Sequence, residues 1–308
     1  MAQPHPLSVP SPGGSAGSAS STGSLAQPTT VGLDPRLAAR VLRASRTAGL
    51  AAASLGLLIL AGRAFGVSAY LAIGPGFVPM KPNAVLGIVL AGLFLWRFRV
   101  REGRRAKWAR RAAGLLVGVV GLLTLSEHLF GWDLGIDQLI LRAAAEELGT
   151  FPPGAMPPVT ALSLALLGVG LLLLEAESNR VVRTVQAMGL TVVLLAFVSL
   201  VSHPYRVQDF YGLASPYARM SIHASIALVL LGVGIFLARP DRGVAALLST
   251  RSAAGVMARR LLPVGIAVPV LLGWLVRAGE QTERYPRGFG FSLLAVANVL
   301  VLSAMISI

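Results

Sequence analysis

The sequence contains no cysteine and few charged residues for its length. Charged side chains make up 13% of the 308 residues, against roughly 25% in a typical soluble domain. The absence of cysteine excludes a disulfide-stabilised fold and any thiolate metal site. The shortage of charge, combined with 55% hydrophobic residues, argues against one or two soluble domains and favours a membrane protein.

Familiar catalytic signatures are also missing. The chain contains no Walker A loop, no HExxH and no G-x-S-x-G. Its glycine clusters lie inside apolar runs, where glycine permits close packing of helices. The paired buried carboxylates of a proton pump are absent, and no spacing of histidines matches a metal-ligand signature. We therefore expect no enzyme activity, no cofactor and no metal centre.

Asp, Glu, Lys and Arg are absent from the first 30 positions, which are mostly Ser, Gly, Pro, Ala, Thr and Gln. Such a segment cannot bury enough apolar surface to offset the entropy lost on ordering. It also lacks the basic and apolar regions of a signal peptide. We expect residues 1–35 to form a disordered cytoplasmic tail and residues 36–308 to form a transmembrane domain.

Eight apolar runs follow this tail. A bilayer core about 30 Å thick requires around 20 apolar residues in a helix, and only helices satisfy the backbone of such runs in lipid. The predicted spans are 48–70, 83–97, 111–131, 159–175, 183–203, 222–238, 261–278 and 289–308. The predicted fold class is therefore all-α, a polytopic helical membrane protein with eight transmembrane helices.

The basic residues are unevenly distributed between the two faces of this predicted topology. Nineteen of the 27 fall before the first span or in the loops after the second, fourth and sixth spans, and this face carries the whole net charge of +14. The positive-inside rule places that face and both termini in the cytoplasm. The high charge then needs no nucleic-acid partner. Anionic lipid headgroups are the expected partners of Arg99, Arg101, Arg104, Arg105 and Lys107.

Three even-numbered spans begin with similar sequences, which indicates an internal repeat. These are MKPNAVLGIVLAG from Met80, MPPVTALSLALLG from Met156 and MSIHASIALVLLG from Met220. Each copy has glycine at position +12, where it permits close helix approach. We predict three repeated helical pairs, about 48–97, 111–175 and 183–238, followed by a last pair over 261–308. The pairs share one orientation, unlike the inverted repeats of many transporters.

Several of these segments carry a family resemblance. The three repeat starts, SEHLFGWDLGIDQLIL after the third span, FLARPDRG and LLPVGIAVPVLLGWL resemble the N-terminal membrane sensor region of bacterial PAS-containing histidine kinases and diguanylate cyclases. The resemblance covers about 40–308. It implies a sensory module in the bacterial inner membrane, within two-component or related signal transduction. Output domains are absent from these 308 residues, so we expect a fragment of a signalling protein or a stand-alone relative.

Polar residues near the span ends are the candidate site. Glu127 and His128 end the third span, His203 ends the fifth, His223 begins the sixth, and Arg63 lies within the first. Such groups could bind a ligand or sense protons, since ionisable residues at membrane depth are costly. The favoured alternative is that they lie at the interface with their polar groups among the lipid headgroups. Metal or haem binding is the least favoured reading.

Three functions fit these observations. The first is a sensory or signal-input module without its own catalytic domain. The alternative is a structural or accessory subunit of a larger membrane complex, and a transporter or channel is the least favoured. For either of the first two we expect a homodimer or other membrane subunits as partners.

Outside the spans, helical spacing of apolar residues predicts surface helices over 136–148 and 244–260.

Overall fold

Helices provide nearly all of the regular structure in this chain, which is described from a computed structural model. The structure describes residues 32–65, 80–99, 103–132, 134–135, 156–205 and 220–281, together with residues 292, 295, 296, 299 and 303. All of them belong to one unit, Gly32–Ile308. The predicted tail lies almost wholly in the other unit, Met1–Val31, which is outside the described residues.

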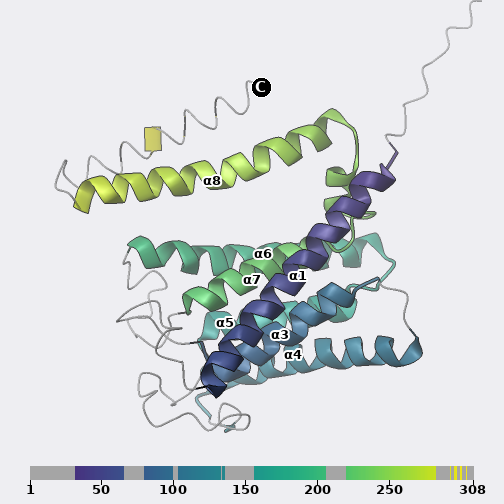
Figure 1. The fold of residues 1–308 in the computed structure, drawn as a ribbon, viewed down its shortest axis with the longest axis vertical. Coiled ribbons are helices and arrows are strands. Elements are labelled where there is room, and N and C mark those ends of the chain that lie inside the picture. Colours follow the sequence, from purple (N-terminus) through teal and green to yellow (C-terminus); the bar gives the residue numbers. More distant parts are fainter. Residues whose placement is uncertain are drawn as a thin grey trace, which may run out of the picture. The chain divides into compact units, whose positions relative to one another are not determined.

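The described part of the chain is all-α, as predicted, and contains no strand beyond an isolated β-bridge between Leu33 and Thr250. Its elements are α1 (Pro35–Ala64), α3 (Pro82–Arg97), α4 (Arg104–Phe130), α5 (Pro158–Leu173), α6 (Asn179–Tyr205), α7 (Ile222–Leu237), the short 3-10 helix η3 (Ala245–Ser249) and α8 (Ala253–Gln281) (Figure 1). By length and composition, α1, α4 and α6 are long and apolar enough to cross a membrane.

The three short apolar helices, α3, α5 and α7, begin and end at the same places relative to the repeated sequence. Each begins two residues after its methionine and contains 16 residues. Proline suits the first position of α3 and α5, because the N–H that it lacks would have no partner within the helix there. In α7 the Ser221 side chain accepts a hydrogen bond from Ala224 N, at 3.1 Å, and caps the helix instead.

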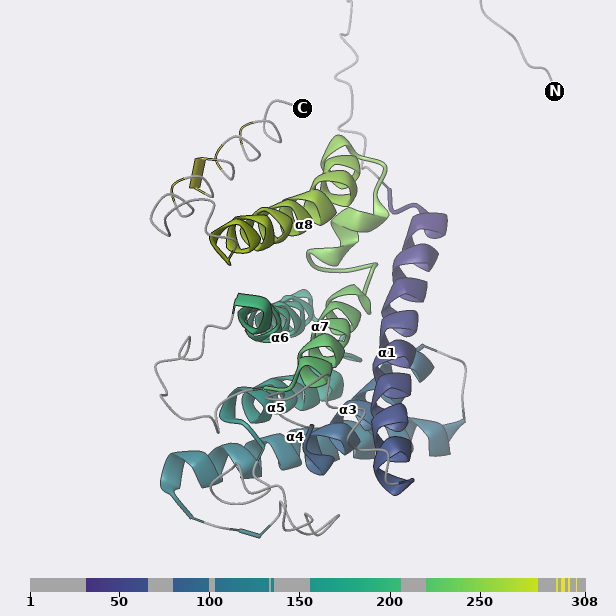
Figure 2. The same ribbon diagram turned by 60° about the vertical axis from the view of Figure 1, so that its left-hand side comes forward.

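Each short helix packs most extensively against one long helix: α3 against α1, α5 against α4, and α7 against α6 (Figures 1 and 2). The repeated glycines lie at these three crossings. A Cβ atom at Gly92 would be 2.5 Å from Gly49 O, one at Gly168 would be 2.2 Å from Gly118 Cα, and one at Gly232 would be 2.6 Å from Gly189 O. The paired helices therefore touch backbone to backbone, which no larger residue would allow.

The core lies among the short helices. The three repeat methionines, Met80, Met156 and Met220, are all buried, and they belong to one hydrophobic core with the large buried side chains of α3, α5 and α7, including Ile88, Leu164 and Leu228. The long helices contribute a narrower buried stripe of mostly small residues. Ser45 on α1 crosses to α7, where its hydroxyl donates to Gly234 O at 2.6 Å.

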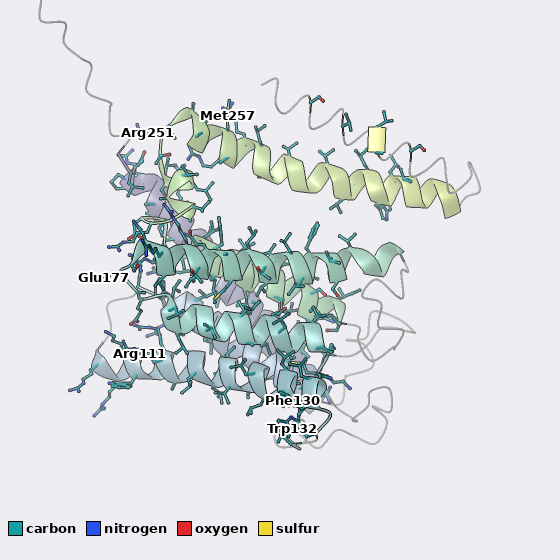
Figure 3. The ribbon with its side chains drawn as sticks, turned by 180° about the vertical axis from the view of Figure 1, so that it is seen from behind. Arg111, Phe130, Trp132, Glu177, Arg251 and Met257 are labelled. Atoms are coloured by element: carbon teal, nitrogen blue, oxygen red, sulfur yellow. The ribbon has the colours of Figure 1, made fainter. Side chains whose placement is uncertain are left out.

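Charged side chains connect the helices at one end of the unit, which we call the basic end. It holds the starts of α1, α4 and α6 and the ends of α3, α5 and α7. Arg99, after α3, pairs with Asp241, after α7, at 3.1 Å, and Arg110 at the start of α4 pairs with Glu175, after α5, at 3.4 Å. Figure 3 shows Arg111 and Glu177 toward this end and Phe130 and Trp132 toward the other.

Two largely buried polar side chains fasten the loop after α7 at the basic end. Arg239 donates to Leu174 O at 3.0 Å and to Ala176 O at 2.9 Å, and so covers the free carbonyls that end α5. Gln186 on α6 donates to Arg242 O at 3.0 Å and accepts from Val244 N at 2.7 Å. Burial raises the pKa of Asp241 in this loop, but a backbone hydrogen bond and the Arg99 side chain outweigh it, so the pKa falls below its ordinary value.

Some predicted elements differ from the observed ones. The surface helix predicted over 244–260 is wrong: η3 ends at Ser249, Thr250 forms the β-bridge with Leu33, and α8 begins at Ala253. The bridge and the bond from Asp34 N to Ser249 O, at 2.8 Å, need extended backbone at that point. The surface helix predicted over 136–148 lies outside the described residues, and so does nearly all of the predicted span 289–308.

Candidate functional site

One narrow buried stripe on α4 leads to the candidate site. It comprises Gly114, Val117, Gly118, Gly121, Thr124 and Glu127, and apart from the adjacent pair Val117 and Gly118 each is three residues from the next, which places them on one helix face. A Cβ atom at Gly121 would lie 2.4 Å from Ala165 N and 2.8 Å from Ala161 O. The stripe therefore runs directly along the backbone of α5, in the antiparallel direction.

The stripe becomes polar toward the C-terminal end of α4. Thr124 is fully buried and Glu127 is 6% exposed, while Thr160 on α5 is 1% exposed. Since Gly121 lies against 161–165 and His128 lies against Met156, the register places Thr124 at the level of Thr160. We call this contact between α4 and α5 the α4–α5 seam. Within the described residues, three buried oxygens at the seam have no hydrogen-bond partner: Thr124 Oγ1, Glu127 Oε2 and Thr160 Oγ1. Buried polar atoms usually have a partner, so this group of three is unusual.

Two other polar atoms of the site, Glu127 Oε1 and His128 Nε2, form hydrogen bonds with the backbone. Glu127 Oε1 accepts from Leu134 N at 2.9 Å. His128 Nε2 lies 2.7 Å from Met156 O, and because a carbonyl can only accept, Nε2 carries the proton and donates. The ring therefore hydrogen-bonds Met156, the residue at which the α5 copy of the repeat begins, and this hydrogen bond does not involve Nδ1.

α4 ends immediately beyond these residues. Gly131 adopts a left-handed conformation, with φ 70°, and its N–H donates to Glu127 O at 2.9 Å, which is a common way to end a helix. Phe130 and Trp132 flank this turn with ring centroids 5.1 Å apart, and both are more than half exposed. Trp132 Nε1 donates to Ser126 O at 3.0 Å. Exposed aromatic rings at a helix end are typical of a membrane interface.

The predicted site residues are only partly brought together. Glu127 and His128 share the α4–α5 seam, whereas Arg63 lies in the last turn of α1 and His223 is half-buried near the start of α7. His203 lies in α6, but its side chain is outside the described residues, so convergence of the three histidines remains a prediction. Among the described side chains, no group of three His, Asp or Glu residues could hold a metal ion.

Thr124 and Thr160 were not among the residues predicted for the site. A sequence signal does exist for Thr124, since it precedes Glu127 by three residues and a helix places both on one face. Thr160 follows the second repeat methionine by four residues, and only the register between α4 and α5 places it opposite Thr124.

The predicted lipid-binding residues occupy different surroundings at the basic end. Arg104, Arg105 and Lys107 lie exposed in the first turn of α4, and Lys107 Nζ is 3.9 Å from Glu175 Oε2. Arg99 pairs with Asp241, and Arg101 lies outside the described residues. Three basic residues at a helix N-terminus oppose the helix dipole, so this interaction disfavours the start of α4.

Comparison with known proteins gives no family assignment. No protein-family model matches the sequence, and no curated protein and no solved structure matches it either.

Proposed function

We propose that this chain is a signal-input module of a bacterial inner membrane, with no catalytic domain of its own among these residues. In this proposal eight spans cross the bilayer as three repeated pairs and a final pair, and both termini lie in the cytoplasm. Support comes from three helices long and apolar enough to cross a membrane and from the shared bounds of α3, α5 and α7. The three glycine crossings support the repeat in the same way.

The proposed orientation follows the charges. The basic end would face the cytoplasm, in accordance with the positive-inside rule. Arg104, Arg105 and Lys107 would contact anionic headgroups there, which gives a reason for basic residues at a helix N-terminus that otherwise disfavours them. The seam between α4 and α5 would then open toward the periplasm.

The observation that carries the sensory proposal is the buried carboxylate of Glu127. Its Oε2 atom and the hydroxyl oxygens of Thr124 and Thr160, all buried along the same helix pair, have no hydrogen-bond partner in the described residues. Keeping such groups buried costs free energy, so their presence at membrane depth indicates a role beyond packing. We infer that the α4–α5 seam binds the signal, either a proton or a small polar solute held by Glu127, Thr124 and Thr160.

Few other ionisable groups compete for this role. Helix α5 has no ionisable side chain between Pro158 and Leu173. Helix α3, which also contacts α4, contributes the buried Lys81 just before its start, and α4 itself contributes His128. A response centred on this seam would therefore depend on Glu127, with Lys81 and His128 as the charged or titratable neighbours.

Trp132 provides a local reporter for the test. We would replace Trp96, Trp108 and Trp274 with Phe, reconstitute the protein in liposomes, and record Trp132 fluorescence while the outer pH or solute composition changes. We expect a reversible change that Glu127→Gln abolishes and that Glu177→Gln, an exposed acid at the basic end, leaves intact. An identical response in the Glu127→Gln protein would refute the sensory role of the seam.

The alternative function is an accessory subunit of a larger membrane complex. The exposed apolar side chains of Leu271, Trp274 and Leu275 on α8, each more than half exposed, would fit a partner helix as well as lipid chains. Purification from native membranes in mild detergent separates the two functions. Stoichiometric recovery of other membrane subunits, together with a silent Trp132 reporter, would favour the accessory role.

A further inference from the structure

A hollow of about 490 Å³ lies between α1 and α3 at the basic end. Its lining residues are Arg43, Arg46, Thr47 and Leu50 from α1 and Trp96 and Arg97 from α3. None of these six is acidic. The hollow is separate from the α4–α5 seam and from the basic residues at the start of α4.

The close crossing of α1 and α3 builds this hollow. A Cβ atom at Gly49 would lie 2.8 Å from Gly92 O and 3.1 Å from Trp96 N. The two backbones meet at that point, so the residues on either side of Gly49 are brought against the end of α3. Arg46 and Leu50, one turn apart on α1, consequently line the same hollow as Trp96.

The three guanidinium groups give the hollow the chemistry of an anion site. Arg46 Nε donates to Phe98 O at 3.0 Å, which fixes the side chain through one of the five N–H donors of its guanidinium group. The Arg97 guanidinium carbon lies 5.7 Å from the centroid of the Trp96 ring. Arginine forks match the oxygens of a phosphate group, and three of them around one hollow favour a phosphate over a single carboxylate.

An apolar strip leads away from the same hollow along α1. Leu50 and Leu57, 41% and 50% exposed, lie two turns apart on one face of the helix. Trp96, which is 39% exposed, lines the hollow together with Leu50. A soluble anion would gain nothing from this strip. A lipid, in contrast, could place its phosphate among the arginines and an acyl chain against the leucines.

We propose that this hollow is a binding site for one anionic phospholipid, whose phosphate contacts Arg43, Arg46 and Arg97 and whose acyl chain lies along Leu50 and Leu57. The proposal requires that α1 crosses a bilayer, but it does not depend on the sensory role of Glu127. It also differs from diffuse attraction at Arg104, Arg105 and Lys107, because it predicts a defined stoichiometry of one lipid per chain.

Native mass spectrometry of the detergent-solubilised chain tests this proposal. We would titrate phosphatidylglycerol, phosphatidylcholine with the same acyl chains, and inorganic phosphate. We expect one tightly retained phosphatidylglycerol, whose affinity falls about tenfold or more in the Arg43→Gln/Arg97→Gln protein. The matched control is Arg180→Gln/Arg183→Gln, which removes the same charge from exposed positions on α6 at the basic end and should retain the lipid.

Three results would overturn the proposal. The first is equal loss of lipid in the two double variants, which would indicate general attraction to the basic end. The second is retention of phosphatidylcholine as tight as that of phosphatidylglycerol. The third is binding of inorganic phosphate as tight as that of the lipid, which would make the hollow a site for soluble phosphate. If the double variant does not fold, the single Arg43→Gln change at an exposed position gives the same comparison with a smaller decrease.

Discussion

The long helices α1 and α4 differ from the short helices α3, α5 and α7 in how much of each is buried. Seven of the 30 residues of α1 and six of the 27 residues of α4 are buried. Among the 16 residues of each short helix, 11 are buried in α3, nine in α5 and eight in α7. Most of the surface of these long helices is thus exposed, while that of the short helices forms the core.

The short helices are therefore closely packed over most of their surface. The long helices contact the short helices through small residues along one stripe, and large apolar residues elsewhere, such as Leu115 and Leu122 of α4, are exposed. Protein interiors tolerate little change in volume, whereas an exposed side chain has room to rearrange. Substitutions should therefore matter most where a short helix meets a long one.

The largest effect is expected at the α4–α5 crossing. Gly168→Ala places a Cβ atom 2.2 Å from Gly118 Cα and N, and only separation of the two backbones could relieve the clash. We expect a loss of at least about 3 kcal/mol of unfolding free energy, measured by thermal unfolding in detergent.

Gly170 is the matched control on the same helix. A Cβ atom there lies 3.5 Å from Ile235 Cδ1, an ordinary contact. Because alanine favours a helix over glycine by about 1 kcal/mol, Gly170→Ala should be neutral or stabilising. Equal destabilisation by both substitutions would show that the glycine crossing has no special role.

A smaller effect is expected where the short helices end. Arg239→Met removes the hydrogen bonds to Leu174 O and Ala176 O and the ion pair with Asp241. We expect a loss of about 2–3 kcal/mol, because carbonyls buried at the end of α5 lose a charged donor. The control is Arg242→Met, whose side chain is 36% exposed and whose pair with Asp241 is long, at 3.9 Å. A surface pair of that kind contributes about 0–1 kcal/mol, so similar losses for both substitutions would contradict the argument.

The smallest effect is expected at the start of the long helix α1. The hydrogen bond from Arg251 holds the pKa of Asp34 below its ordinary value of 3.8, with help from Arg36 N. A lowered pKa in the folded protein means that the contact stabilises the fold above about pH 4 and that this stabilisation is lost as the pH falls through the lowered pKa.

Hydrogen exchange measures this local effect. Protection of the Asp34 amide, which donates to Ser249 O, should decrease below pH 4, while amides in the middle of α3 stay protected. Asp34→Asn should decrease that protection at pH 7 and remove its pH dependence. A pH-dependent decrease that persists in Asp34→Asn would assign the effect to another group.

The sequence allowed the helical class and the short helices to be predicted, because both depend on local patterns. The repeat methionines and prolines mark the starts of α3 and α5, and the glycine at position +12 marks each crossing. Arg239, in contrast, counted only as one basic residue of a loop, although it is buried and fastens α5. Its role depends on contacts between segments about 65 residues apart, which periodicity does not report.

The candidate site was predicted only in part for a similar reason. Glu127 and His128 stand out because ionisable residues are rare in apolar runs. Thr124 and Thr160 do not, since threonine is uncharged, and only the register of α4 against α5 places Thr160 at the level of Thr124. The helix predicted over 244–260 was wrong because its apolar spacing continues through Thr250, where the isolated β-bridge to Leu33 requires extended backbone.

The three glycine crossings also limit how this molecule can move. Backbone atoms in contact have no rotamers with which to accommodate sliding, so each long helix and its short companion should shift together as one stiff lever. Motion would then arise between neighbouring levers, where side chains such as Ile235 and Leu95 fill the space. A displacement at one end of such a helix pair would then be transmitted to its other end.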